Sequence, residues 1–193
     1  MNSLEYERIM ESRELFKTME KENIEKGLAI LEELAESKSR YAIYELGKLY
    51  KEGKYVDKNI KKAFNLFVYS GELGNLKSFY DAGMIFKENK DYKNAKRYFE
   101  KAKYSLDAYL ELGKMALEGR GMKSSKHQAF IYYNEASKLG SSKADYYLAE
   151  AYINGNGVKV DYKKGQHYLN KALRKHEKDV FKLEDKIVII KRL

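Results

Sequence analysis

The segment from Ser105 to Ser141 reads SLDAYLELGKMALEGRGMKSSKHQAFIYYNEASKLGS and contains two amphipathic stretches joined by a turn with two glycines. The segment from Ser142 to Leu173, SKADYYLAEAYINGNGVKVDYKKGQHYLNKAL, repeats its pattern. Both read A-x3-[LA]-[GA]-x2-[AY]-x2-G-x-G-[MV], then a short polar stretch, then [AG]-x6-A. Units of this kind cannot bury their apolar faces alone, so each one must stack on its neighbours.

The pattern returns along the chain at intervals of 30 to 36 residues. Successive mid-stretch small residues are separated by 36, 30 and 36 residues, and a second small residue follows each of them after twelve or sixteen residues. Periods of this length are typical of stacked helical pairs. The sequence therefore predicts an all-α fold, a right-handed α-solenoid of tandem antiparallel helical pairs. The first small residues are Gly47, Gly83, Gly113 and Ala149, and the second are Ala63, Ala95, Ala129 and Gly165.

Domain boundaries follow from the same spacing. We expect one solenoid over residues 1–177, in which residues 1–37 form a degenerate first pair. This first pair is inferred because the segment Asn23–Gly27 resembles Asn59–Ala63 at a 36-residue step. The expected full repeats are 38–75, 76–104, 105–141 and 142–177.

The C-terminal residues 178–193 are expected to form a capping helix. Within this segment, Val180, Leu183, Ile187 and Ile190 follow helical spacing and give it one apolar face. A repeat array needs such ends, because its terminal pairs would otherwise expose apolar surface. The alternative is that this helix docks a partner or a second copy of the chain.

The small residues in the middle of the predicted helices are interpreted as packing positions. Glycine in a helix interior costs about 1 kcal/mol relative to alanine, and this cost is tolerated where a bulky side chain of the paired helix must approach closely. A larger side chain stands four residues after each second small residue, on the same helical face. These larger side chains are Phe67, Phe99, Tyr133 and Leu169.

Composition narrows the class of protein. The chain has 193 residues and no cysteine, so disulfides and thiolate metal sites are excluded. Its longest apolar run, Ile187–Ile190, has four residues and is too short to cross a bilayer. The N-terminal residues contain no unbroken apolar stretch of the kind that signal peptides carry. We therefore expect a cytoplasmic protein that does not enter a membrane.

The net charge of +9 is unevenly distributed. Residues 1–37 carry ten acidic and five basic side chains, whereas residues 38–193 are strongly basic. A basic surface attracts polyanions or acidic protein surfaces, and it speeds their encounter most at low salt. We therefore expect a protein partner with an acidic surface or an extended segment. A solvated lysine-rich surface without any partner is the alternative.

The turns of the two strongest units contain the glycines Gly119, Gly121, Gly155 and Gly157. At these residues the chain resembles the Sel-1-like repeat, the subfamily of tetratricopeptide repeats with a longer turn inside each helical pair. Two units depart from the pattern: the unit near Ser39 has Lys54-Tyr55-Val56 where the second glycine would stand, and the unit from Leu76 lacks four turn residues. The resemblance implies a protein-interaction scaffold.

The first helix of each pair lines most of the concave surface in stacked helical pairs. The positions that face this surface lie three before, one after and four after the mid-helix small residue. They form a candidate partner-binding face of tyrosines, apolar residues and lysines, a mix common at interaction surfaces. Lys48, Lys51 and Lys87 are expected to project from this face without packing. The alternative is that the tyrosines only pack the repeats together. The selected residues are Tyr44, Lys48, Lys51, Tyr80, Met84, Lys87, Leu110, Lys114 and Tyr146, with Leu117, Glu150 and Ile153 at the remaining positions.

Sequence signatures of catalysis and of cofactor binding are missing. The three histidines, His127, His167 and His176, have no nucleophile or carboxylate around them in a recognisable arrangement. No zinc-protease, Walker A or dinucleotide-binding motif occurs. The Gly-Arg-Gly and Gly-Asn-Gly turns resemble phosphate loops only superficially, because they recur at repeat spacing. We expect no enzyme activity, no cofactor and no metal.

The leading hypothesis is a non-catalytic scaffold or adaptor that holds a partner protein in its concave face. The alternative is a small basic regulator or inhibitor of a nucleic-acid enzyme or ribonucleoprotein, for example a phage-encoded blocker of bacterial nuclease defence. No helix-turn-helix, RNA-binding or zinc signature supports sequence-specific nucleic-acid recognition. Salt dependence separates the two hypotheses, because phosphate binding weakens steeply with salt.

Overall fold

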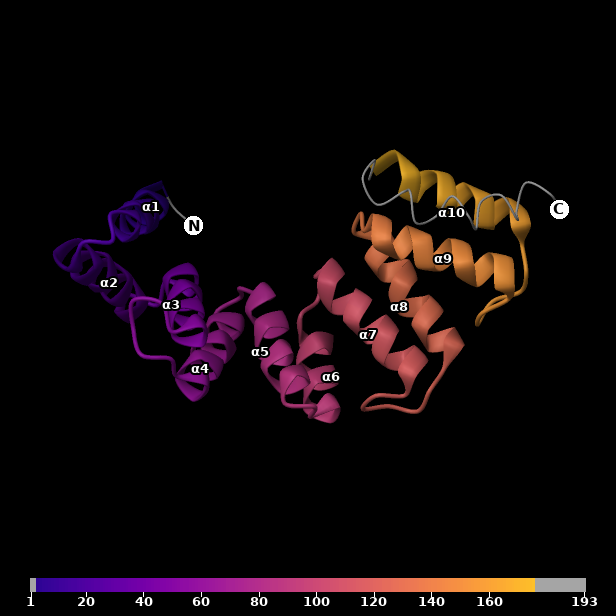
Figure 1. Cartoon of the computed structure of the whole chain (residues 1–193), viewed down its shortest axis with the longest axis horizontal. Coiled ribbons are helices and arrows are strands. Elements are labelled where there is room, and N and C mark those ends of the chain that lie inside the picture. The colour runs from indigo at the N-terminus through magenta and orange to yellow at the C-terminus, as the bar shows by residue number, and fades with distance from the viewer. Residues whose placement is uncertain (1–2, 176–193) are drawn as a thin grey trace. The chain divides into compact units, whose positions relative to one another are not determined.

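The computed structural model describes residues 3–175 of the chain. Over this range the chain forms ten α-helices and no strand (Figure 1). The predicted all-α helical-repeat fold is thereby confirmed, whereas the predicted capping helix at 178–193 lies outside the described residues. The helices are α1 (Ser3–Lys17), α2 (Lys21–Glu36), α3 (Arg40–Glu52), α4 (Ile60–Glu72), α5 (Lys77–Glu88), α6 (Tyr92–Lys101), α7 (Leu106–Glu118), α8 (Lys126–Lys138), α9 (Ser142–Asn154) and α10 (Tyr162–Lys175).

The helices pack as consecutive pairs, α1 with α2, α3 with α4, α5 with α6, α7 with α8 and α9 with α10. In each pair the second helix runs back along the first (Figure 1). Neighbouring pairs meet where α2 contacts α3, α4 contacts α5 and α8 contacts α9. The chain divides into two compact units, unit 1 (Met1–Lys103) and unit 2 (Tyr104–Leu193).

Polar side chains set the starts of the helices. The Oγ atom of Ser39 accepts a hydrogen bond from the backbone N–H of Ala42 at 3.1 Å. Such a cap satisfies one of the backbone donors that the first helical turn leaves unpaired. The same bond is made at other helix starts by Asn59, Asp91, Ser105, Ser125 and Ser141.

Glycines in the left-handed conformation end the first helix of three pairs. Gly53, Gly119 and Gly155 have φ angles of 70°, 71° and 67°. Glycine enters this region without the steric cost that a Cβ atom brings. The helices therefore end at the glycines from which the sequence pattern placed the turns.

Tyr55 takes the left-handed position that Gly121 and Gly157 hold in the turns of unit 2, with a φ angle of 65°. Its ring stacks on the ring of Phe16 in α1, at a centroid distance of 4.7 Å. Its hydroxyl donates a hydrogen bond to the backbone oxygen of Phe16 at 3.0 Å. The glycine that this turn lacks is thus replaced by a side chain that attaches the turn to the first helical pair, and these contacts offset the backbone strain.

The mid-helix glycines are places of close helix approach. A Cβ atom on three of them would lie under 3.0 Å from an aromatic ring of the paired helix. Their interpretation as packing positions is confirmed, because a larger residue would have to displace that ring from a close-packed interior. The nearest approaches are 2.7 Å for Gly47 and Phe67, 2.6 Å for Gly83 and Phe99, and 2.4 Å for Gly113 and Tyr133.

Candidate functional site

Side chains of α3 and α5 join across one surface of unit 1. The Tyr44 hydroxyl donates a hydrogen bond to Asp81 Oδ2 at 2.9 Å, and Lys51 Nζ lies 3.4 Å from Glu88 Oε1. These contacts join the two helices across this surface, which also receives Arg13 of α1 through its bond to Glu45. We call it the helix-A face of unit 1 and define it as Arg13, Tyr44, Glu45, Lys48, Lys51, Lys77, Tyr80, Asp81, Met84, Lys87 and Glu88.

Glu45 is shared by two cations on this face. It accepts a hydrogen bond from Arg13 Nη2 at 2.7 Å, and its other oxygen lies 2.8 Å from Lys48 Nζ. Lys48 Nζ also lies 5.4 Å from the centroid of the Tyr44 ring, whose face attracts cations. One carboxylate thus faces two cations, so this part of the face keeps a positive charge.

Asp81 is the second shared carboxylate. Burial raises the pKa of Asp81, while the hydrogen bond from Tyr44 and the positive charges of Lys51, Lys77 and Lys48 act against this shift. The same burial raises the pKa of Tyr44 above its usual value, so the phenol stays protonated and continues to donate. Lys48 also pairs with Glu45 and Lys51 with Glu88, so the positive excess is that of the whole face, which has five cationic side chains and three carboxylates.

An acidic residue that recurs at the same position of three first helices was not predicted. Glu45, Asp81 and Glu111 each stand two residues before a mid-helix glycine. The signal was present in the sequence, because Glu45 and Glu111 are each followed by a lysine three residues later, a spacing that allows an ion pair along a helix. Lys48 and Lys114 lie 2.8 and 2.7 Å from these carboxylates, so each lysine forms an ion pair along its own helix.

In unit 2 the predicted residues separate. Leu110 is 7% exposed and belongs to the apolar core together with Leu148 of α9. The prediction that Leu110 lies on a binding surface is therefore wrong. The other repeats have a tyrosine at this position, whose polar end stays at the surface, whereas the leucine is covered. Tyr146 and Lys114 are half-buried, and the Tyr146 hydroxyl donates to Glu150 Oε1 at 2.8 Å. That the first helices of both units form one groove stays a prediction.

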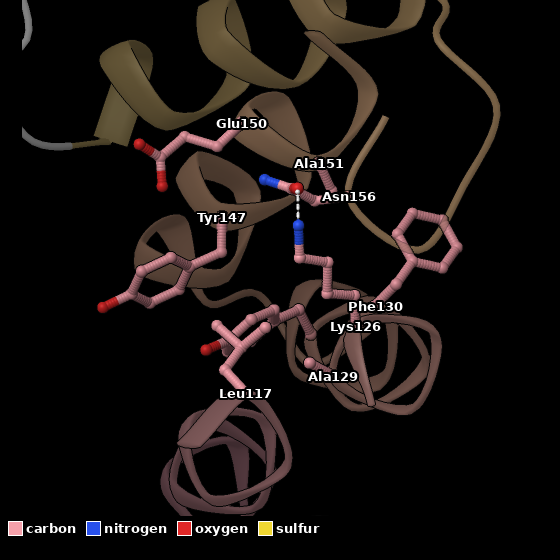
Figure 2. Close-up of a pocket in the computed structure, with 9 residues that line it drawn as sticks. Leu117, Lys126, Ala129, Phe130, Tyr147, Glu150, Ala151 and Asn156 are labelled. Carbon is pink, nitrogen blue, oxygen red and sulfur yellow. Dashed lines mark hydrogen bonds between the residues drawn. The ribbon is translucent and has the colours of Figure 1, made fainter. Parts of the chain in front are cut away.

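Unit 2 has a pocket of about 50 Å³ among side chains of α7, α8, α9 and the turn after α9 (Figure 2). At its rim, Lys126 Nζ donates a hydrogen bond to Asn156 Oδ1 at 2.9 Å. Leu117 and Glu150 of its lining were among the positions predicted from the sequence. The other lining residues were not, because they belong to the second helix α8, to other positions of α9 and to the turn after α9. The lining residues are Leu117, Lys126, Ala129, Phe130, Tyr133, Tyr147, Glu150, Ala151 and Asn156.

The glycine turn after α9 packs against the start of α8. A Cβ atom on Gly157 would lie 2.3 Å from the backbone oxygen of Lys126, and His127 Nδ1 lies 3.0 Å from the backbone oxygen of Gly157. Gly157 thus permits a close approach of two backbones, and the turn serves packing between helical pairs. This packing also holds Asn156 beside Lys126 at the pocket rim.

A buried carboxylate, which was not predicted, joins three helices of unit 2. Asp145 of α9 is fully buried, and its Oδ1 atom accepts hydrogen bonds from Ser137 Oγ of α8 and from Lys171 Nζ of α10, the latter at 2.8 Å. Lys171 Nζ also donates to Ser137 Oγ at 2.9 Å. Lys171 therefore takes part in the packing of unit 2.

Within residues 3–175, no group of three or more histidine, aspartate or glutamate side chains is placed to hold a metal ion. No helix in the same range is both long and apolar enough to cross a membrane. The two surfaces described above offer ion pairing, hydrogen bonding and aromatic contact to a ligand.

A protein-family model described as Sel1 repeat matches residues 40–75, 78–104, 106–141 and 142–176. The chain belongs to the Sel1 repeat family. Membership of this family indicates a protein-interaction scaffold. No curated protein matches the sequence of this Sel1 repeat chain at a significant level.

Solved structures support the family assignment. The chain is 29% identical to c5321, a protective antigen present in uropathogenic Escherichia coli strains displaying an SLR fold, with a TM-score of 0.72 over 87% of this chain. The match covers 37% of the length of that antigen. A Sel1 repeat protein from Oxalobacter formigenes is 22% identical over 82% of this chain and 68% of its own, with a TM-score of 0.74. MamA is 18% identical over 85% of this chain and 95% of its own, with a TM-score of 0.52. The last two likenesses show the fold alone.

Proposed function

We propose that this chain is a non-catalytic adaptor that binds an acidic segment of a partner protein on the helix-A face of unit 1. The observation that carries the proposal is that this face has five cationic side chains and three carboxylates, so a positive excess remains after its ion pairs are counted. Glu45 faces Arg13 and Lys48, and Asp81 lies in the field of three lysines. An excess of positive charge on one surface steers an acidic segment toward it and favours the bound register.

The apolar and aromatic members of the same face supply contact area. Tyr44, Tyr80 and Met84 are each half-buried, so part of each side chain is fixed by the fold and part is open to a ligand. Tyrosine loses little conformational entropy on binding, and methionine adapts its shape to the ligand. A segment with acidic side chains and a few apolar ones fits this mixture.

Reversing the charge of Lys48, Lys51 and Lys87 together to glutamate is expected to weaken partner binding at least about tenfold, which corresponds to a loss of about 1.4 kcal/mol. The reversed side chains repel an acidic segment where the wild-type lysines attract it. Helical content should stay unchanged, because all three side chains reach solvent. The partner is identified by capture from the native host with mass spectrometry, and dissociation constants are then measured by calorimetry.

The matched control reverses Lys61, Lys90 and Lys103, which also belong to unit 1 and carry the same charge. All three are exposed, and none of them makes an ion pair within the described part of the chain. Equal weakening in both triple variants would show general electrostatic steering instead of a defined surface. Unchanged binding in the first triple variant would overturn the proposal.

Salt dependence tests the nucleic-acid hypothesis with the same proteins. A nucleic-acid ligand loses affinity steeply with salt, because each neutralised phosphate releases counterions. The acidic-protein proposal would fail if the captured ligand were nucleic acid and its affinity fell steeply with salt. It would fail equally if the control triple variant weakened binding of that ligand more than the first triple variant.

A further inference from the structure

A second pocket, of about 70 Å³, lies between α1 and α3 in unit 1. It adjoins the helix-A face of unit 1, because Arg13, Tyr44 and Glu45 belong both to that face and to the lining of the pocket. We call it the α1–α3 pocket. The other lining residues are apolar or aromatic and are Tyr6, Ile9, Met10 and Tyr41.

The α1–α3 pocket opens on the surface and has an apolar inner end. Tyr6 is 51% exposed, and Met10, Tyr41 and Tyr44 are half-buried. Ile9, at 3% exposed, closes the inner end. A side chain that enters the pocket leaves water for contact with apolar and aromatic atoms. This transfer is favourable for an aliphatic group and costly for a polar one.

Three polar groups of the lining already have partners within unit 1. The Tyr44 hydroxyl donates to Asp81, and the Tyr41 hydroxyl accepts a hydrogen bond from Arg40 Nη2 at 3.2 Å. The two oxygens of Glu45 are held by the two cations described above. Because these groups are satisfied by the fold, the pocket favours an apolar occupant over one that needs hydrogen bonds.

The repeat register shows why apolar surface is open at this place. A Cβ atom on Gly27 would lie 3.1 Å from the backbone oxygen of Ser12, as one on Gly165 would lie 3.5 Å from that of Ala149. Ser12 therefore takes the place of the mid-helix small residue in α1. Two residues before it stands Met10, where α3, α5 and α7 have an acidic residue. The first helical pair thus has an apolar side chain in place of the recurring carboxylate.

The charged groups at the α1–α3 pocket favour an acidic segment. Arg13 stands three residues after Met10 on the same face of α1, and Lys48 Nζ lies 5.4 Å from the centroid of the Tyr44 ring. Among the residues that the structure describes, the lining contains one carboxylate, Glu45, which faces two cations. The four glutamates of α1 lie outside this described lining.

From these observations we infer that the α1–α3 pocket receives a leucine side chain of the acidic partner segment. The inference rests on the proposed function for the segment itself. A space of about 70 Å³ is less than half of the cavity of about 150 Å³ that holds a benzene ring in another protein. It therefore suits a branched aliphatic group better than an aromatic ring. Acidic residues beside the leucine are attracted by Arg13 and Lys48, which fixes the register of the segment.

The probe is a synthetic peptide, acetyl-Glu-Asp-Leu-Asp-Glu-amide, titrated into the whole 15N-labelled chain and followed by amide chemical shifts. It should shift the resonances of Met10 and Tyr41. It should also bind about tenfold more tightly than the same peptide with a central alanine, which corresponds to about 1.4 kcal/mol for burying the larger side chain. A central phenylalanine, or flanking residues changed to glutamine and asparagine, should weaken binding of the leucine peptide.

Four results of this titration would each overturn the inference. They are a leucine peptide that does not bind, equal affinity of the leucine and alanine peptides, tighter binding of the phenylalanine peptide, and undiminished binding of the peptide with neutral flanks.

Met10→Gln keeps the size of the side chain and makes the pocket wall polar, so the leucine peptide should lose most of its advantage over the alanine peptide. Tyr6→Ala removes the exposed wall and should have the same effect, and helical content should stay unchanged because this side chain is 51% exposed. Met84→Gln is the matched control: Met84 is half-buried on the helix-A face of unit 1 but outside the pocket, so the advantage should remain. An advantage that persists in either pocket variant, or that is lost equally in Met84→Gln, would contradict the assignment of the leucine to this pocket.

The peptide titration and the charge-reversal experiment fail independently. If the leucine peptide binds as expected but reversal of Lys48, Lys51 and Lys87 leaves partner binding unchanged, the proposed function fails while the preference of the pocket for leucine stands. If the leucine and alanine peptides bind equally but the charge-reversed chain loses the partner, the pocket assignment fails while the proposed function stands.

Discussion

Replacing Gly113 with leucine is expected to lower the free energy of unfolding by about 3 kcal/mol, the upper range for overpacking a core. A Cβ atom at this position would lie 2.4 Å from Tyr133 Cε1 and 2.7 Å from Cδ1. The Tyr133 ring cannot move away without cost, because it is stacked on the Tyr147 ring at a centroid distance of 4.5 Å. Leucine recovers about 1 kcal/mol of helix propensity over glycine, so the steric cost dominates. Urea unfolding followed by circular dichroism measures the change.

Lys123→Leu is the control for this substitution. Lys123 is exposed in the turn between α7 and α8, so a leucine there should change stability by less than about 0.5 kcal/mol. If both variants unfolded at the same urea concentration, the close approach of α7 and α8 would be disproved.

The positions that could be predicted are those whose environment is set by their own repeat. Gly47 and Gly113 recur at repeat spacing because each faces a ring four residues beyond a small residue on the paired helix, and both contacts exist. The role of Tyr133 as a core ring was predictable for the same reason. That its hydroxyl is buried without a hydrogen-bond partner could not be predicted, since this depends on how α9 packs on α8.

The positions that could not be predicted depend on neighbouring pairs. Leu110 satisfies the positional rule for the binding face, yet it is buried together with Leu148 of the next pair. The position of a residue in its repeat predicts the direction in which its side chain points. It does not predict whether a neighbouring helical pair covers that side chain. Lys51 and Glu88 pair across α3 and α5, a contact between repeats that no local spacing encodes. For the helix-A face of unit 1, the sequence selected six of the side chains but missed Arg13, Lys77 and the carboxylates that partly neutralise the cations. That this face binds a partner stays a prediction.

Replacing Lys171 with methionine is expected to destabilise the protein by about 3 kcal/mol, the lower range for breaking a buried ion pair. Asp145 is fully buried, its Oδ1 atom depends on Lys171 and Ser137, and its Oδ2 atom has no partner. Methionine keeps the apolar part of the side chain and removes only the charge, so a buried carboxylate is left uncompensated. The Lys171 side chain is 35% exposed. Water can therefore reach the site when the ammonium group is removed, which lowers the free-energy cost of the unpaired carboxylate. Thermal and urea unfolding measure the loss.

The matched control is Lys164→Met on the same helix, because Lys164 is 61% exposed and pairs with Asp161 at 3.6 Å across the surface. An exposed pair of this kind contributes about 0 to 1 kcal/mol, so this variant should unfold almost like the wild type. Adding Asp145→Asn to Lys171→Met should recover at least half of the lost stability, because the double variant no longer buries a charge. Equal stability of the two single methionine variants would show that Asp145 is neutralised by something other than Lys171. If the double variant were no more stable than Lys171→Met alone, Lys171 would contribute through packing. Its ammonium group would then not act by stabilising the buried charge of Asp145.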